Sequence, residues 1–240
     1  MENPLVAFYN FLNTGGFAMW ILLVISIISI GIVFERFFFF SRQHSDPTQL
    51  LREIGDRVQR DDMNGAIAVC DRHHGMLPKI LQFGLYRHEK SRADISDALS
   101  IALLEQLNAL EANLPIIGTV AVISPFVGLF GTVLGIIRAF QDIALKGNST
   151  PAVVAAGVSE ALITTAAGLL VAVIAVVFFN YFKSRIKAYN QEMIVAANKL
   201  AEMLHFHNTG SPIPTELYNP RGAGSKAPAP APRPSGPGGA

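Results

Sequence analysis

The stretch that decides the fold, residues 153–179, reads VVAAGVSEALITTAAGLLVAVIAVVFF. About 20 apolar residues span a hydrocarbon core of about 30 Å, so this stretch is long enough to cross a membrane. Glu160 is the only formally charged side chain between Lys146 and Lys183. An ionisable group at mid-helix costs about 2.5–3.5 kcal/mol on insertion scales, and it normally faces a protein interior, a cavity or an ion path. We therefore look for function first at Glu160.

Three apolar blocks indicate an integral membrane protein. The blocks cover residues 17–34, 114–137 and 153–182, and the charged residues, 15% of the 240-residue chain, gather outside them. The mean hydropathy of +0.36 supports the same class. We expect an all-α fold with three membrane-spanning helices. The net charge of +1 gives no reason to expect a nucleic-acid partner.

The cysteine and histidine content argues against several kinds of site. The chain has one cysteine, Cys70, so no intrachain disulfide is possible and a reducing cytoplasm is compatible. His73 and His74 lack the spacing of a metal site and are interpreted as surface residues. We expect no metal and no cofactor. No Lys or Arg precedes the first block and no small-residue cleavage site follows it, so we interpret this block as a permanent anchor.

The basic residues predict the orientation in the membrane. They follow the first and the third block: Arg36, Arg42, Lys183, Arg185 and Lys187. Since cytoplasmic flanks carry an excess of Lys and Arg, we expect both of these ends in the cytoplasm and the N-terminus outside. Arg138 and Lys146, near the turn between the second and third blocks, weaken this count without reversing it.

These observations set the expected segments of the chain. The membrane helices are expected at 17–40, 113–140 and 152–182. The remaining segments alternate in location: an extracytoplasmic 1–16, a cytoplasmic helical loop 41–112, an extracytoplasmic turn 141–151, a cytoplasmic helical stalk 183–207 and a tail 208–240. The tail is rich in Pro, Ala and Gly and cannot bury a core, so we expect it to be disordered.

Local signals predict helices in the loop 41–112. Asp46 is placed to cap a helix that has Pro47 at its first position. Asn64-Gly65 and His74-Gly75 are expected to bound a short second helix.

A longer helix is expected to follow and to continue into the second block. Ser91 and Asp94 resemble a capping box at its start. Pro115 and Pro125 are expected to kink this helix without ending it, where neighbouring helices satisfy the freed carbonyls. The third block likewise continues as an apolar stripe, so we expect one helix over residues 151–206, about 80 Å long.

Small and hydroxyl residues mark one face of the second and third blocks. In the second block Gly128, Thr132 and Gly135 share a face, and Gly131 is a further small residue of the block. Small residues on such a face let another helix approach closely. In the third block a matching face holds small and polar residues: Ala156, Glu160, Thr164 and Gly168, with Thr165 beside them. A lone carboxylate and several hydroxyls on such faces suggest a polar-lined path between helices.

Two stretches resemble a known family. Residues 125–140, PFVGLFGTVLGIIRAF, and residues 157–169, GVSEALITTAAGL, closely resemble the signature of the ExbB and TolQ family of inner-membrane proton-channel proteins, distant relatives of the flagellar stator protein MotA. The resemblance covers about the whole chain apart from the tail. It implies a homopentamer in the bacterial inner membrane, in which the second and third spans surround a central pore.

The resemblance also implies partners. One or two copies of a single-span protein, ExbD or TolR, are expected to place a helix with an essential Asp inside the pore. Proton flow would then drive rotation of one component against the other and pass energy to the cell envelope, through a TonB-like or TolA-like protein. Nutrient uptake, envelope maintenance and motility all remain open as the powered process.

Site roles are carried over from the family residue by residue. Glu160 matches the carboxylate of the third span, Thr165 the pore-lining Thr after it, and Thr132 the Thr of the second span. Thr164 is assigned to the same path, and the glycines Gly128, Gly131, Gly135 and Gly168 are assigned to helix packing. One departure is Ile174, where the family often has Pro, and a straighter helix is expected there.

Simpler interpretations of the same residues stay open. Glu160 has an alternative role as polar glue between helices. The hydroxyls of Thr132, Thr164 and Thr165 have an alternative use, which is to bond back to the carbonyl four residues earlier in their own helix. Arg36, with its neighbour Glu35, is interpreted as marking the cytoplasmic interface by snorkelling.

Other function classes fit less well. An intramembrane enzyme needs a nucleophile with a base, or metal ligands, at membrane depth, but all six histidines lie outside the three blocks. We therefore expect no enzymatic activity and no catalytic residue. A transporter acting alone would be expected to show an internal repeat. A purely structural scaffold explains the small-residue faces and leaves Glu160 unexplained.

Overall fold

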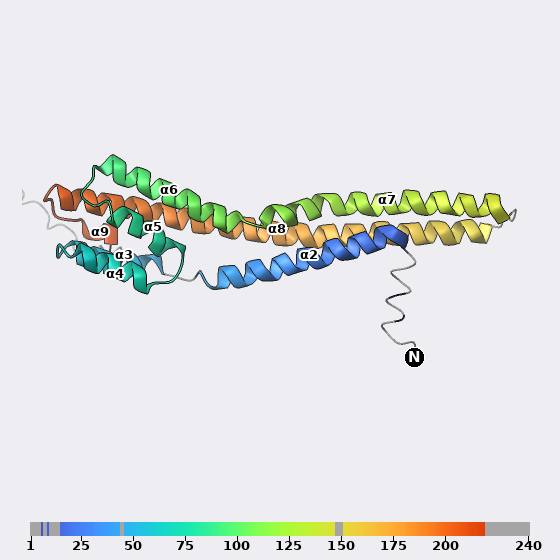
Figure 1. Ribbon diagram of the computed structural model, residues 1–240, viewed down its shortest axis with the longest axis horizontal. Helices are drawn as coiled ribbons and strands as arrows, with labels where there is room; N and C mark the ends of the chain where they lie inside the picture. The colour runs from blue at the N-terminus through green and yellow to red at the C-terminus, as the bar shows by residue number, and fades with distance from the viewer. Residues whose placement is uncertain (1–5, 7–8, 10–14, 44–45, 147–150, 219–240) are drawn as a thin grey trace, which may run out of the picture. The chain divides into compact units, whose positions relative to one another are not determined.

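The computed structural model describes residues 6, 9, 15–43, 46–146 and 151–218. Within α7 and α8, the side chains at 145, 146, 151–154, 156 and 160 also lie outside the described part. Every described regular element is an α-helix (Figure 1): α2 Gly16–Ser41, α3 Pro47–Val58, α4 Met63–Arg72, α5 Met76–Leu85, α6 Arg92–Glu111, α7 Leu114–Lys146, α8 Pro151–Asn208 and α9 Thr215–Tyr218. The chain divides into a first unit, residues 1–43 and 105–190, and a second unit, residues 44–104 and 191–240.

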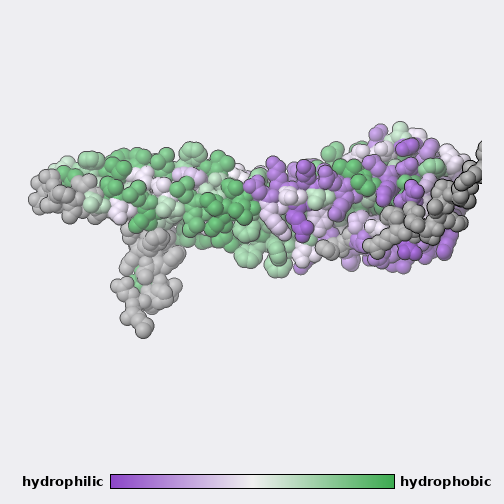
Figure 2. Space-filling model, turned by 180° about the vertical axis from the view of Figure 1, so that it is seen from behind, coloured by the Kyte–Doolittle hydropathy of each residue, from purple (hydrophilic) through white to green (hydrophobic). Residues whose placement is uncertain are grey.

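Three of the described helices are long and apolar enough to cross a membrane. They are α2, α7 and α8. Large apolar side chains point outward along them, for example Phe34 on α2, Phe126 on α7 and Leu170 on α8, each more than 60% exposed. Figure 2 shows hydrophobic residues over much of the visible surface of these helices. Such outward faces suit lipid or another protein chain.

Helix α8 is continuous over its 58 residues. Its length is therefore about 87 Å, far more than a bilayer needs. Position 174, where an Ile stands, lies inside this unbroken helix. The uninterrupted run follows from the sequence, because no Pro or Gly lies between Gly168 and Asn208.

The second unit has a conventional core built on short capped helices. Asp46 accepts from the backbone N–H of Thr48 at 2.9 Å, with Pro47 opening α3, so the predicted cap is confirmed. Leu50 and Ile54 of α3 are fully buried. At Gly84 of α5 the neighbours come from two other helices, because an added Cβ would lie 2.9 Å from Leu99 Cδ2 and 3.2 Å from Leu200 Cδ2.

Two details of the loop differ from the sequence-based expectation. Helix α4 begins at Met63, where Asp62 caps it by accepting from Gly65 N–H at 2.8 Å. Asn64-Gly65 therefore lies inside the first turn of α4 and does not precede it. The expectation also contained no helix at residues 76–85, where α5 lies.

The expectation of one helix running from the loop through Pro115 is wrong. Helix α6 ends at Glu111 and α7 begins at Leu114, and Asn113 between them has a φ of 62°. Pro115 has no N–H to donate to the carbonyl of Glu111, which favours a break at this point. Pro125, in contrast, lies inside the continuous α7.

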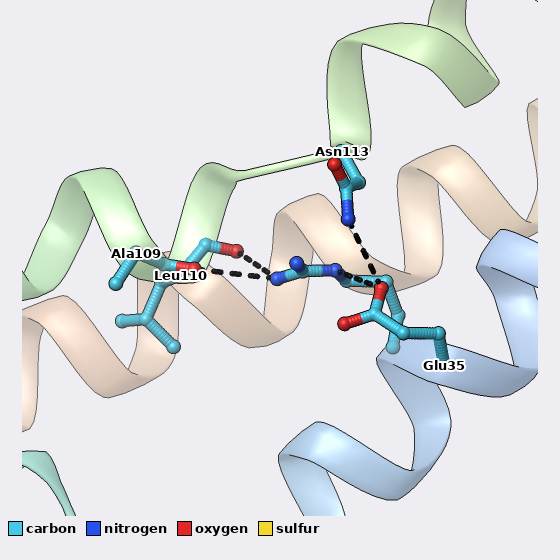
Figure 3. A network of polar contacts seen from close by, with 5 residues as sticks. Glu35, Ala109, Leu110 and Asn113 are labelled. Atoms are coloured by element: carbon cyan, nitrogen blue, oxygen red, sulfur yellow. Dashed lines mark hydrogen bonds and ion pairs between the residues drawn. The ribbon is translucent and has the colours of Figure 1, made fainter.

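Arg36 is not a snorkelling residue, because its side chain is only 4% exposed. It donates from Nη1 to the carbonyls of Ala109 and Leu110 at 3.3 and 3.2 Å, both in the last turn of α6 (Figure 3). These carbonyls lose their helical donors where α6 ends. A residue of α2 thus supplies hydrogen-bond donors to the carbonyls at the end of α6.

The chain after α8 also differs from expectation over its first residues. A disordered tail was expected from 208, but α9 lies against α3. Tyr218 accepts from Gln59 Nε2 at 2.7 Å, and an added Cβ at Gly55 would lie 2.6 Å from the Cβ of Tyr218. The absence of a side chain at Gly55 therefore makes room for Tyr218. Residues 219–240 of the expected tail lie outside the described residues.

Candidate functional site

The second and third apolar blocks meet at backbone distance. An added Cβ at Gly128 of α7 would lie 3.0 Å from the Cα of Thr165 and 3.3 Å from the Cα of Gly168 on α8. An added Cβ at Gly168 would lie 2.6 Å from the carbonyl oxygen of Ser124. No side chain fits between these backbones, so glycine is required on both helices for this approach. We call this contact the α7–α8 seam.

The seam continues toward the turn between the two helices. An added Cβ at Gly135 would lie 2.8 Å from Ala161 Cβ, and one at Gly157 would lie 2.7 Å from Ala139 Cβ. Gly131 faces the side chain of Thr164. Positions that rise along α7 thus meet positions that fall along α8, which is the antiparallel arrangement visible in Figure 1. The four glycines assigned to packing, Gly128, Gly131, Gly135 and Gly168, all lie in this seam within one chain.

The three threonine hydroxyls are used in different ways. Thr165 Oγ1 donates across the seam to the carbonyl of Gly128 at 3.0 Å. Thr164, which is 1% exposed, donates to the carbonyl of Gly15 at 3.3 Å, just before α2 begins. Thr132 donates at 2.6 Å to the carbonyl of Leu129 in its own helix, three residues earlier. Thr132 therefore bonds back within its own helix, although to the carbonyl three residues earlier and not four as expected, whereas Thr164 and Thr165 connect separate segments.

Glu160 belongs to α8, and its side chain lies outside the described part of the structure. Its described neighbours on the helix, Gly157 and Ala161, both contact α7 through Ala139 and Gly135. Position 160 is therefore next to the seam. Its proposed role in proton transfer, like the roles of Thr132, Thr164 and Thr165 in the path, stays a prediction.

A cation lies beside the same end of the seam. Arg138 of α7 is exposed, and an added Cβ at Gly16 would lie 2.8 Å from its Nη1. A hollow of about 10 Å³ lies among Arg138, Thr164 and Gly15, the residue before Gly16. One water needs about 10–15 Å³ measured in this way, so the hollow has no room for a chain of waters.

The packing at the seam has a chemical consequence. Helices α7 and α8 of one chain close on each other directly, through glycine, alanine and the threonine side chains. A continuous proton path between these two helices of a single chain is therefore not available at the described positions. A path that uses the second and third blocks would therefore have to run outside the seam.

Sequence reasoning missed two contributors to this site. One is the carbonyl of Gly15, which binds the buried hydroxyl of Thr164 over 149 positions of sequence. The other is Ser124, which donates to Val120 at 2.7 Å and presents its own carbonyl to Gly168. Ser124 is itself one of the small residues of the second block, so the sequence contained a signal for it, but no local pattern pointed to Gly15.

Comparisons with known proteins agree on one family. The model of the MotA/TolQ/ExbB proton channel family matches residues 72–194, which include the whole seam. The Tol-Pal system protein TolQ of Pseudomonas aeruginosa is 40% identical over 111 residues, which cover 46% of this chain and 48% of that protein. The match thus spans about half the length of that relative.

Two further matches cover more of the chain. The biopolymer transport protein ExbB of Salmonella typhimurium is 31% identical over 185 residues, covering 70% of this chain and 76% of that protein. The solved structure of MotAB from C. jejuni matches with a TM-score of 0.55 at 17% identity, covering 86% of this chain and 79% of that one. At this identity the structural match bears on the fold alone.

Proposed function

Because this chain belongs to the MotA/TolQ/ExbB proton channel family, we propose that it is the channel subunit of an ExbB–ExbD or TolQ–TolR type motor. In this proposal five copies assemble around a pore in the bacterial inner membrane. A single-span partner of the ExbD or TolR kind supplies a membrane Asp, and the proton motive force drives the complex. The motor would then energise a process in the envelope, through a TonB-like or TolA-like protein.

The observation that carries the proposal is the closed α7–α8 seam. It joins Gly128, Gly131, Gly135 and Gly168 inside one chain and leaves large apolar side chains outward, such as Phe126 and Leu170. Several copies placed side by side would bury part of that outward surface and enclose a space between chains. Thr132, Thr165 and Glu160 would contribute to the wall of that space. The pore would thus belong to the assembly.

The proton chemistry divides between two chains in this proposal. A carboxylate binds and releases a proton, and threonine hydroxyls both donate and accept hydrogen bonds, so they support a chain of waters. The three apolar blocks of this chain contain one carboxylate, Glu160, and no Asp. A second carrier at membrane depth therefore has to come from the partner.

The orientation follows from the charged flanks. Arg36 near the end of α2, Arg42 just after it, and Lys183, Arg185 and Lys187 within α8 would lie on the cytoplasmic side. The N-terminus and the turn between α7 and α8 would then be periplasmic. Relatives named ExbB and relatives named TolQ both match, so the powered process is best identified through the single-span protein that co-purifies with this chain.

Two substitutions at Glu160 test the proposal. Glu160→Gln keeps size and hydrogen bonding but removes the titratable proton, whereas Glu160→Ala removes both. Both variants should co-purify with the partner and lose proton-dependent function, measured by complementation of a deletion strain. A fully active Glu160→Gln would contradict the proton-carrying role. Retained activity in Gln with lost assembly in Ala would instead show that Glu160 only joins helices, as in a structural scaffold.

A further inference from the structure

The break between α6 and α7 is held by side chains from a different helix. Arg36 of α2 donates to the carbonyls of Ala109 and Leu110, and its Nε lies 2.9 Å from Glu35 Oε2. The same Glu35 oxygen accepts from Asn113 Nδ2 at 3.4 Å. Figure 3 shows these contacts converging on the two-residue connection between the helices. We call Arg36, Glu35 and Asn113 the joint network.

The network differs from an ordinary helix end. Helix C-termini are usually completed locally, by a glycine in the left-handed region and bonds within the next few residues. Here Asn113 is in that region with a φ of 62°, and the freed carbonyls of α6 are served by an arginine 73 positions earlier in the chain. Its positive charge also suits the negative end of the α6 dipole. The joint network thus holds the connection between α6 and α7 against the end of α2.

Burial makes the arginine informative. Its side chain is 4% exposed, while Glu35 is 46% exposed, and Arg36 Cζ lies 4.9 Å from the centre of the Phe39 ring. Taking a guanidinium out of water is costly unless every donor direction finds a partner. A hydrophobic residue would fill the same place at a lower desolvation cost. The hydrogen bonds of the guanidinium group instead fix one arrangement of α2 against the end of α6.

The place of the joint along the chain connects it to the proposed function, on which this inference rests. Helix α7, which starts at Leu114, carries Thr132 and one side of the seam. Helix α6 begins at Arg92, in the part of the chain assigned to the second unit. Residues 112 and 113 are therefore the direct covalent route by which a displacement of α7 would reach α6.

We propose that Arg36 is a positioning residue for proton-driven movement, which ties the α6–α7 connection to α2. With the network intact, the start of α7, the end of α6 and the end of α2 move as one piece. Without it, α7 moves and the connection at 112–113 absorbs the displacement. Proton transfer then continues while less of it is converted into work on the envelope.

Two variants and a matched control separate this role from plain stabilisation. Arg36→Met keeps the length of the side chain without charge, and Arg36→Lys keeps the charge but not the fork of donors that reaches Glu35 and two carbonyls together. Arg42→Met removes an exposed arginine close to the same helix end and serves as the control. Each is expressed in the full chain with its co-purifying single-span partner.

The first measurement compares two quantities. One is complementation of a deletion strain, and the other is proton uptake by proteoliposomes that contain the purified complex; their ratio reports how much proton flow is converted into work. We expect Arg36→Met to lower this ratio about 2- to 30-fold, the range found for residues that modulate coupling. Arg36→Lys should restore part of the ratio, and Arg42→Met should equal the natural chain. A fall in complementation that merely follows the amount of assembled complex would overturn the proposal.

The second measurement reads the joint directly and does not depend on activity. Spin labels on Ser41→Cys and Asn108→Cys, both exposed positions of the first unit, report the distance between the ends of α2 and α6. The distance distribution should broaden in Arg36→Lys and in Arg36→Met, and stay narrow in Arg42→Met. If Arg36→Met fails to assemble, Arg36→Lys carries both measurements. Unchanged distributions in the arginine variants would overturn the proposal.

The proposed function can fail independently. If Glu160→Gln keeps full proton-dependent activity, the proton-carrying role of Glu160 in the proposed function is wrong, whatever the labels at positions 41 and 108 report. If Glu160→Gln is inactive while the Arg36 variants match the natural chain in both measurements, the joint alone is wrong.

Discussion

The α7–α8 seam and the core of the second unit are held together in opposite ways. The seam consists of glycines and alanines that let two backbones touch, as at Gly128 and Gly168, with large side chains turned outward. The core of the second unit turns large side chains inward, and Leu50, Ile54 and Leu200 are fully buried. In lipid there is no hydrophobic gain from burying leucine, so close packing has to hold the helices. In water the burial of leucine itself stabilises the fold.

This contrast predicts that added atoms damage the seam most. Gly168→Leu would place a side chain against the carbonyl of Ser124, which cannot move aside without displacing α7. We expect a loss of about 3 kcal/mol and little folded complex, because overpacking that forces the backbone to shift costs about 1–3 kcal/mol and occasionally more. The measurement is the yield of monodisperse protein in mild detergent. Gly31→Leu is the matched control, since nothing lies within 4 Å of a Cβ added there, and a yield equally poor in both variants would contradict the contrast.

The second unit should instead be sensitive to removed atoms. Leu200→Ala empties a fully buried position in the part of α8 that belongs to the second unit and should cost about 2–5 kcal/mol. Leu170→Ala, on the same helix but 63% exposed, should change stability by less than about 1 kcal/mol. Thermal denaturation of the purified complex measures both. Equal losses would mean that the outward face of α8 is buried as deeply as its second-unit face.

The single side-chain hydrogen bond that Thr165 donates across the seam should contribute less. Thr165→Val removes the donor to Gly128 and keeps the shape, for an expected loss of about 1 kcal/mol. Thr132→Val removes only a bond within α7 and should cost less. Thr165→Ser keeps the hydroxyl and is the control. If proton uptake falls in Thr165→Val far more than thermal stability does, the hydroxyl has a role in the path beyond the seam.

The end of the chain offers a comparison inside the second unit. A chain that stops after Tyr218 keeps α9 on α3 and should behave like the full chain. A chain that stops after Gly210 loses the contact of Tyr218 with Gly55 and Gln59, with an expected cost of about 1 kcal/mol. The thermal midpoints of the two truncated proteins measure this difference. Identical midpoints would show that α9 adds nothing to the unit.

The smallest expected effect concerns Cys70, which is 3% exposed. Burial, aided by the nearby Asp71, raises the pKa of the Cys70 thiol to about 12. A raised pKa keeps the thiol protonated, and reactivity would grow only as the pH approaches that value. At about pH 7 to 9 a maleimide should therefore leave Cys70 unmodified in the folded protein and modify it after unfolding, as mass spectrometry would show. Rapid labelling of the native chain would mean that the α4 region opens.

Cys70 is thus a poor reporter of topology, and an exposed position such as Ser100→Cys is a better one.

Local patterns predicted much of this architecture. Asp46 and Pro47 are sufficient to start α3, and the uninterrupted apolar stripe after Gly168 is sufficient to keep α8 helical. Both features depend on residues within a few positions of each other, which is the range over which capping and helical periodicity act.

The features that sequence could not predict depend on distant partners. The end of α6 depends on Arg36, 73 positions away, and the seat of Tyr218 depends on the missing side chain of Gly55. The small-residue faces predicted that some helix would approach closely, but not that α7 and α8 of one chain would use both faces on each other. That pairing decides where a proton path has room, and it requires three-dimensional contacts.

The glycines of the seam also limit which substitutions this chain can accept during evolution. Any single-base change in a glycine codon that alters the residue introduces at least a Cβ. At Gly168 even that first carbon meets a backbone carbonyl, and at Gly128 it meets the Cα of Thr165. Most point mutations of these two codons should therefore be lost by selection, whereas the codon of Gly31 is free to drift. A saturation-mutagenesis map of the natural gene would show the seam as a narrow line of forbidden substitutions, one helical turn apart, within otherwise permissive apolar sequence.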